Sequence, residues 1–144
     1  MIETQFTACC ERAIQDKDTN NVSLVELIVQ INADSLPIHF PRMDCVFILW
    51  RDEEDSELVE GSLSFSMIDG EEISREPVTI DFEGKKRTRL TARIHGLVVP
   101  EPGILEASLH LEEGEGGSWK IQVNKTGEPE IEAAQADVEG VEAD

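Results

Sequence analysis

Apolar and polar residues alternate with a period of two along much of the chain, and this pattern predicts β-strands. The alternation is clearest in the segments 62–67, 78–83, 89–94, 105–111 and 119–124. Because successive side chains of a strand point to opposite faces of the sheet, each segment builds one apolar and one polar face. Half-buried strands of this kind are typical of antiparallel sandwiches and barrels.

The first third of the chain alternates less regularly. Residues 22–33 have a length that also suits a helix, but their β-branched residues favour a strand. Residues 34–43 contain Pro37 and Pro41 and are predicted to be a connection or an irregular edge strand. Residues 44–51 are almost all apolar, which predicts a strand buried on both faces, or buried on one face and exposed to a partner on the other.

The pattern as a whole predicts an all-β fold, an antiparallel β-sandwich of about eight strands of the immunoglobulin-like, Greek-key type. The expected strands are 5–14, 22–33, 44–51, 58–68, 77–83, 87–99, 104–111 and 118–124. Gly96 is predicted to bend or bulge its strand. Residues 1–126 are predicted to form the sandwich domain and residues 127–144 a disordered acidic tail, because that segment is acidic and consists largely of small residues.

Charge and cysteine content restrict the partners and the compartment. The 144 residues hold 31 acids and 12 bases, a formal charge of −19. Such a charge repels nucleic acids and anionic membranes and favours basic partners, so neither a nucleic acid nor a membrane is predicted as a partner. The start of the chain lacks the pattern of a secretory signal, no apolar run is long enough to cross a membrane, and three cysteines lack disulfide spacing, so a cytoplasmic protein is predicted.

No segment carries a recognisable catalytic, cofactor-binding or metal-binding motif, and an enzyme is not predicted. Residues 16–20 match the first half of a calcium loop, but the glycine and glutamate that should follow are missing, and a capped turn is favoured. His39, His95 and His110 lack the paired spacing of zinc ligands. Cys9 or Cys10 would need a neighbouring base to act as a nucleophile, whereas cysteine is also a common core residue.

Two clusters of charge each allow two interpretations. Five of the twelve bases lie close together, at Lys85, Lys86, Arg87, Arg89 and Arg93. They form either an anion-binding patch or simple compensation for acids on a neighbouring strand such as Asp81 and Glu83, and the overall acidity favours compensation. The acidic segment 52–60 is either a solvated loop, which is favoured, or a surface for a basic partner.

The apolar strand at 45–50 supplies the predicted partner-binding site. If Val46, Ile48 and Trp50 face the core, the opposite parity needs a second cover. The residues left on that side and on the neighbouring strand are predicted to form a partner-binding patch: Phe47, Leu49, Leu24 and Ile28. Cover by the connection 34–43 explains the same residues equally well, and the sequence leaves both alternatives open.

Several segments together resemble one protein family. They are CCERAIQDKDTNNVSLVELI, PRMDCVFILWR, LSFSMIDGEEI and HGLVVPEPGILEASLHLEEG, and together they span roughly residues 6–125. The chain resembles an uncharacterised family of small bacterial and phage proteins, a domain of unknown function. The resemblance implies a β-sandwich fold, no established activity and no catalytic residues.

These observations predict a non-enzymatic protein-interaction or structural module, with an accessory subunit of a bacterial or phage-encoded assembly as one setting. The expected partner is a protein, either a second copy or another subunit, so an oligomer is one outcome. The alternative hypothesis is an acidic decoy that occupies a basic or nucleic-acid-binding surface of a partner. The two differ in their response to salt, since apolar binding survives high salt and acidic docking does not.

Overall fold

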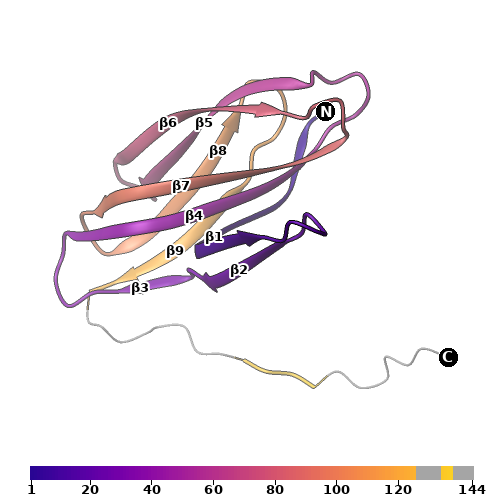
Figure 1. The fold of residues 1–144 in the computed structure, drawn as a ribbon. Helices are drawn as coiled ribbons and strands as arrows, with labels where there is room; N and C mark the ends of the chain where they lie inside the picture. The colour runs from indigo at the N-terminus through magenta and orange to yellow at the C-terminus, as the bar shows by residue number, and fades with distance from the viewer. Residues whose placement is uncertain (126–133, 138–144) are drawn as a thin grey trace.

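The fold is a sandwich of two β-sheets, seen in a computed structural model that describes residues 1–125 and 134–137 (Figure 1). The described residues form nine strands and no helix. The strands are β1 (Glu3–Gln15), β2 (Val22–Leu27), β3 (Gln30–Asn32), β4 (Ile38–Trp50), β5 (Leu58–Met67), β6 (Glu72–Asp81), β7 (Arg87–Val99), β8 (Gly103–Leu111) and β9 (Ser118–Asn124). Sheet A has the order β2-β1-β4-β7 and sheet B the order β3-β9-β8-β5-β6.

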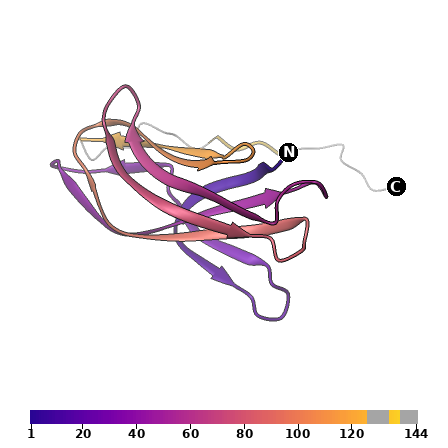
Figure 2. The same ribbon diagram turned by 90° about the horizontal axis from the view of Figure 1, so that it is seen from above.

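The predicted all-β sandwich is confirmed. Sheet A contains the pairing β4–β7 and sheet B the run β9–β8–β5, which correspond to strands B–E and G–F–C of an immunoglobulin-like sandwich. The pairs are antiparallel except for β3–β9, which is parallel. Figure 2 shows the two layers from above, with the turn of the β1–β2 hairpin projecting away from the sandwich.

Two predicted element boundaries were wrong in the first third of the chain. The single strand expected at 22–33 is divided, because β2 belongs to sheet A and β3 to sheet B. Residues 34–43 were expected to be a connection or an irregular edge strand, and from Ile38 onward they form the first half of β4, which extends this strand beyond the predicted start at residue 44. Pro41 is tolerated there because β1 pairs with β4 only at Asp44–Trp50, which leaves the preceding residues of β4 with a free edge.

Gly96 marks the irregularity that the sequence predicted in β7. Its φ of +68° lies in the left-handed region that glycine adopts readily. Before Gly96 the side chains that pack on the core have even numbers, as at Ile94, whereas after it they have odd numbers, as at Leu97 and Val99. The strand therefore changes the face it buries at this glycine, while its register with β4 continues without a shift, so Gly96 bends the strand and does not add a bulge.

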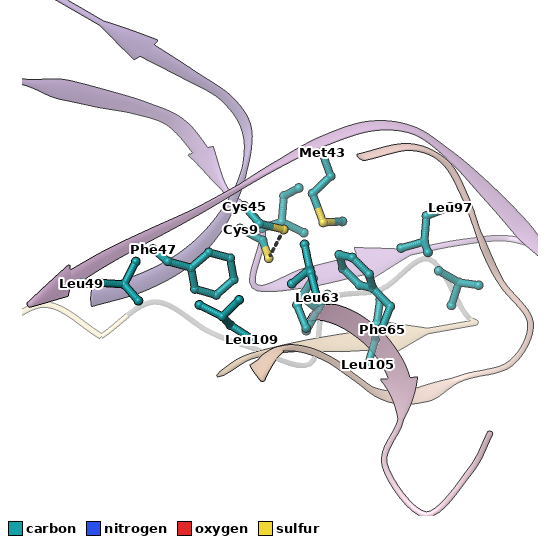
Figure 3. Packing of buried hydrophobic residues seen from close by; sticks show 14 of the residues in the cluster. Cys9, Met43, Cys45, Phe47, Leu49, Leu63, Phe65, Leu97, Leu105 and Leu109 are labelled. Carbon is teal, nitrogen blue, oxygen red and sulfur yellow. Dashed lines mark hydrogen bonds between the residues drawn. The ribbon is translucent and has the colours of Figure 1, made fainter. Parts of the chain in front are cut away.

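The core lies between the two sheets, and it corrects the predicted orientation of β4. Met43, Cys45, Phe47 and Leu49 point into the core with side chains no more than 1% exposed. Figure 3 shows the side chains of Phe47 and Leu49 on the side of β4 that faces Leu109 of sheet B. The expectation that Val46, Ile48 and Trp50 face the core was wrong, because a run that is apolar on both parities gives no indication of which parity faces the second sheet.

The predicted disordered tail at residues 127–144 lies outside the described residues except for 134–137, which form neither strand nor helix. The described sandwich ends with β9 at Asn124. Within residues 1–125 and 134–137, no helix is long and apolar enough to cross a membrane.

Candidate functional site on the outer face of sheet A

Arginine side chains gather on the outer face of sheet A, where β4 and β7 pair. The register places Arg42 beside His95, Asp44 beside Arg93, Ile48 beside Arg89 and Trp50 beside Arg87. Along residues 42–50 and 87–95 they alternate with the side chains that pack on the core, at 43–49 on β4 and 90–94 on β7, so they share the outer face. We call the following set the basic face: Arg42, Arg87, Arg89, Arg93 and His95.

Asp44 is the acid at the centre of the basic face. Its side chain is 0% exposed, and its carboxylate accepts a hydrogen bond from the backbone N–H of Ala13 at 2.9 Å. The guanidinium groups of Arg42 and Arg93 each donate to it at 3.4 Å. Burial alone would raise the pKa of Asp44, but the Ala13 hydrogen bond and the two arginines outweigh that effect and hold the pKa below its usual value. Asp44 therefore stays ionised and anchors two arginines.

Arg87 and Arg89 lie at the other end of the basic face. The guanidinium carbon of Arg87 lies 5.1 Å from the ring centroid of Trp50, within the range of a cation–π interaction. Arg89 donates a hydrogen bond from Nη1 to the backbone oxygen of Asn20 at 3.0 Å, which ties β7 to the turn of the β1–β2 hairpin. Among the described residues, no carboxylate oxygen lies within 4.0 Å of the guanidinium nitrogens of Arg87 or Arg89.

A cavity of about 650 Å³ opens beside these two arginines. The hairpin turn at Thr19–Val22 forms one wall, and the other is formed by Ile48 of β4 with Lys85, Arg87, Thr88 and Arg89. Asp81 and Glu83 also line it, so its charge is mixed. Its volume falls in the range of sites that hold small molecules or side chains.

The predicted partner-binding set does not form a surface patch. Phe47 and Leu49 are 0% exposed and Ile28 is 8% exposed, and all three belong to the core cluster. Leu24 is half-buried on β2, the outermost strand of sheet A. The second sheet covers the face for which the sequence suggested either a partner or the connection 34–43.

The charge compensation expected for the β7 arginines takes a different form in the structure. Asp81 belongs to β6 of sheet B, which is not a hydrogen-bonded neighbour of β7, so the two strands form no cross-strand ladder. Compensation comes instead from Asp44 for Arg93, and from Glu53 for Lys86 at 3.5 Å. The pairing of β4 with β7 also brings Trp50 to Arg87, although no aromatic residue lies next to the arginines in the sequence.

The cysteines lie in the sheet interior and are not exposed. Cys9 and Cys45 are opposite each other on β1 and β4, and their sulfur atoms are 3.1 Å apart (Figure 3). The hydrogen bond from Cys9 and then burial raise the pKa of Cys45 well above its usual value, and burial raises the pKa of Cys10. Since the thiolate is the reactive form, both thiols are poor nucleophiles at neutral pH.

The other residues considered from the sequence have structural surroundings. The predicted turn at 16–20 is confirmed, because Asp16 Oδ1 accepts hydrogen bonds from the backbone N–H groups of Asp18 and Thr19 at 2.8 and 3.3 Å. His110 Nε2 lies 2.9 Å from Ser64 Oγ across two neighbouring strands. Within residues 1–125 and 134–137, no three His, Cys, Asp or Glu side chains come together closely enough to hold a metal ion.

Residues 5–124 match the model of DUF6941, described as a family of unknown function. The chain belongs to DUF6941. This confirms the resemblance to an uncharacterised family. A comparison with curated proteins gave no match. The matched range runs from β1 to the last residue of β9, so the basic face lies entirely inside the DUF6941 domain.

Sequence reasoning detected the arginines but not the site that they form. The alternation of Arg87, Arg89 and Arg93 with smaller residues already indicated a shared face. The contribution of β4 was missed, because Arg42 lies in the segment expected to be a connection or an irregular edge strand, and because Asp44 begins an apolar run. The strand pairing between residues 42–50 and 87–95 is a long-range feature that the local pattern does not encode.

Proposed function

We propose that this DUF6941 domain is a non-enzymatic protein-interaction module that docks an acidic segment of a partner protein on the basic face of sheet A. The observation that carries the proposal is the separation of charge. In a chain of formal charge −19, the outward residues of β4 and β7 include four arginines and a histidine, and their acid, Asp44, is buried. A cytoplasmic accessory subunit of a bacterial or phage-encoded assembly is the setting we propose for it.

The total charge does not prevent such docking, because salt screens charges over a short distance. At about 0.15 M salt the Debye length is about 8 Å, so a short segment on the basic face interacts mainly with the nearby arginines. A long nucleic acid, in contrast, would extend beyond the face and over the acidic remainder of the surface. The geometry therefore favours a short acidic peptide segment over a nucleic acid.

The arginines are arranged to receive carboxylates. Asp44 positions Arg42 and Arg93 from below, and Trp50 positions Arg87 from the side. Side chains held in this way lose less conformational entropy when they bind a ligand. The planar guanidinium group also offers paired donors that match the two oxygens of a carboxylate.

The alternative function, an acidic decoy for a basic partner, has weaker support. In the acidic segment, Glu57 is paired with Arg51 at 3.6 Å and Glu53 with Lys86 at 3.5 Å. Asp52 and Asp55 contact the amino group of Met1 at 2.8 and 3.1 Å. Much of the charge that a decoy would present is therefore already engaged within the domain.

The proposal can be tested with a dye-labelled synthetic peptide that contains only glutamate and glycine, measured by fluorescence anisotropy. The double variant Arg87→Glu, Arg89→Glu reverses two charges on the basic face. The matched control is Lys120→Glu, Lys125→Glu, which makes the same charge change at exposed positions on and after β9 of sheet B. Circular dichroism and thermal unfolding confirm that both variants are folded.

We expect the basic-face variant to bind the peptide about tenfold more weakly than the wild type at about 0.15 M salt, and the control variant to bind within about twofold. Binding by the wild type should be lost at about 1 M salt, where the Debye length is about 3 Å. Equal losses in the two variants would show that the basic face is not the site. Tighter binding of a single-stranded DNA of equal charge would contradict a protein partner.

A further inference from the structure

Sheet A and sheet B separate at one side of the sandwich and leave a cleft of about 480 Å³. The cleft lies between the second half of β7 and the first half of β6, where Figures 1 and 2 show the two strands diverging from their connection. Buried Leu63 and Phe65 of β5 line it, together with Ile73 of β6 and with Ile94 and Leu97 of β7. Leu63 and Phe65 are no more than 2% exposed, so the accessible apolar surface of the cleft comes mainly from the half-buried side chains of Ile73 and Ile94.

Both strands that border the cleft are the last strands of their sheets. In the described residues, β7 pairs only with β4 and β6 pairs only with β5. The outer edge of β7 consequently carries backbone N–H and C=O groups without a strand partner, a template for adding a further strand. The strand is long, since it runs from Arg87 to Val99.

A strand added to the edge of β7 would present its side chains to two different environments. Those on one parity would enter the cleft on its apolar side, beside Ile94 and Leu97, while Ser74 and Glu76 line its polar side. Those on the other parity would extend the outer face of sheet A, next to Arg93 and His95. A segment that alternates apolar and acidic residues satisfies both environments, because it fills the cleft and neutralises the basic face.

We propose that an extended segment of a partner protein, alternating apolar and acidic residues, adds to sheet A as a strand along the free edge of β7. This inference rests on the proposed function and specifies the binding mode and the pattern of the partner segment. A second copy of the chain is a poorer occupant. Antiparallel pairing of two β7 strands would bring Arg89 and Arg93 of both copies onto one face, and like charges facing each other across strands are destabilising.

The test compares two labelled peptides of equal composition, one with alternating valine and glutamate and one with the same residues in blocks. Ser74→Trp fills the cleft, because Ser74 lies on the inner face of β6 opposite Phe65. Glu76→Trp is a second variant at an exposed position of the cleft, in case Ser74→Trp does not fold. Thr79→Trp is the matched control, since it adds the same ring on β6 at an exposed position outside the cleft.

We expect the alternating peptide to bind the wild type about tenfold more tightly than the block peptide, because strand addition gains main-chain hydrogen bonds as well as charge contacts. The cleft variants should remove this difference, and Thr79→Trp should retain it. The alternating peptide should also slow hydrogen exchange of backbone amides in β7. Protection confined to β7 would distinguish strand addition from side-chain docking.

The other outcomes separate the two proposals. If both peptides bind equally and the basic-face variant weakens both, strand addition is wrong while acidic docking stands. If neither peptide binds, both proposals are wrong. If light scattering shows that the wild type is a dimer, and the cleft variants are monomers, a second copy occupies the edge and the proposed acidic segment does not.

Discussion

Truncation of Phe47 distinguishes a core residue from an interface residue, the two roles that its sequence pattern leaves open. Phe47 is 0% exposed in the single chain and packs between the sheets (Figure 3). Phe47→Ala should therefore lower the free energy of unfolding by about 3–5 kcal/mol, since the loss of buried apolar surface and the cavity left behind add up. For a domain with a total stability of about 5–15 kcal/mol, this is a large fraction.

The control is Phe6→Ala, which removes the same ring from the outer face of sheet A. Phe6 is 40% exposed, so its truncation should lower the free energy of unfolding by about 1 kcal/mol or less. Phe47→Leu provides an intermediate step of about 1 kcal/mol that is expected to fold in every case. Together the three variants form a graded series in which only burial differs strongly between Phe47 and Phe6.

Urea unfolding followed by circular dichroism measures the series. With an m-value of about 2 kcal/mol/M, Phe47→Ala should lower the midpoint by about 2 M, and Phe6→Ala should lower it by about 0.5 M or less. Light scattering on the same samples should give the same oligomeric state for all variants. The reasoning would be refuted if Phe47→Ala were no more destabilising than Phe6→Ala and changed the oligomeric state, because Phe47 would then lie at an interface between chains.

Three further predictions concern charge, thiols and backbone. Asp44→Asn should lower the free energy of unfolding by about 1–3 kcal/mol at pH 7. Because the folded state lowers the pKa of Asp44, the wild type should lose this advantage as the pH falls below about 4. Equal urea midpoints for the two proteins at pH 7 would contradict this prediction. Cys10 and Cys45 should resist iodoacetamide at pH 8 in the native protein but react fully in urea, as mass spectrometry can measure, and rapid native labelling would show that these thiols are accessible. Gly96→Val should lower the melting temperature by several degrees because its φ of +68° is unfavourable for a β-branched residue, whereas an unchanged temperature would place no strain there.

Alternation of apolar and polar residues predicted the strands well wherever one face of the strand is exposed to solvent. The segments with strict alternation became β5 to β9, and Asp69 takes the positive φ of 65° that a tight turn after β5 requires. The turn at 16–20 was also predicted from local residues, because the side chain of Asp16 accepts a hydrogen bond from the backbone of its own loop. In each case the information lies within a few residues of the chain, so local physics is sufficient.

The errors lie where the decision depends on distant residues. The run at 44–51 is apolar on both parities, so only the position of sheet B decides that Phe47 faces the core. Residues 38–43 pair only with β7, more than 50 positions later, and Pro41 hides that pairing from a local pattern. The basic face shares this limitation, since Arg42 and Arg93 meet at Asp44 only after β4 and β7 have paired.

The outer face of sheet A also shows why apolar residues outside the core do not by themselves mark a docking surface. Ala8, Cys10 and Val46 have outward parity on β1 and β4, yet each is 0% exposed. Small side chains lie low on the sheet, so longer neighbours on the same face can cover them. Two apolar side chains of β1 remain accessible on this face, Phe6 at 40% and Ile14 at 45% exposure, beside guanidinium groups such as that of Arg93, which is 54% exposed. A partner approaching this face therefore meets apolar side chains on β1 and guanidinium groups on β7, and selectivity for an acidic partner must depend on where that partner places its carboxylates.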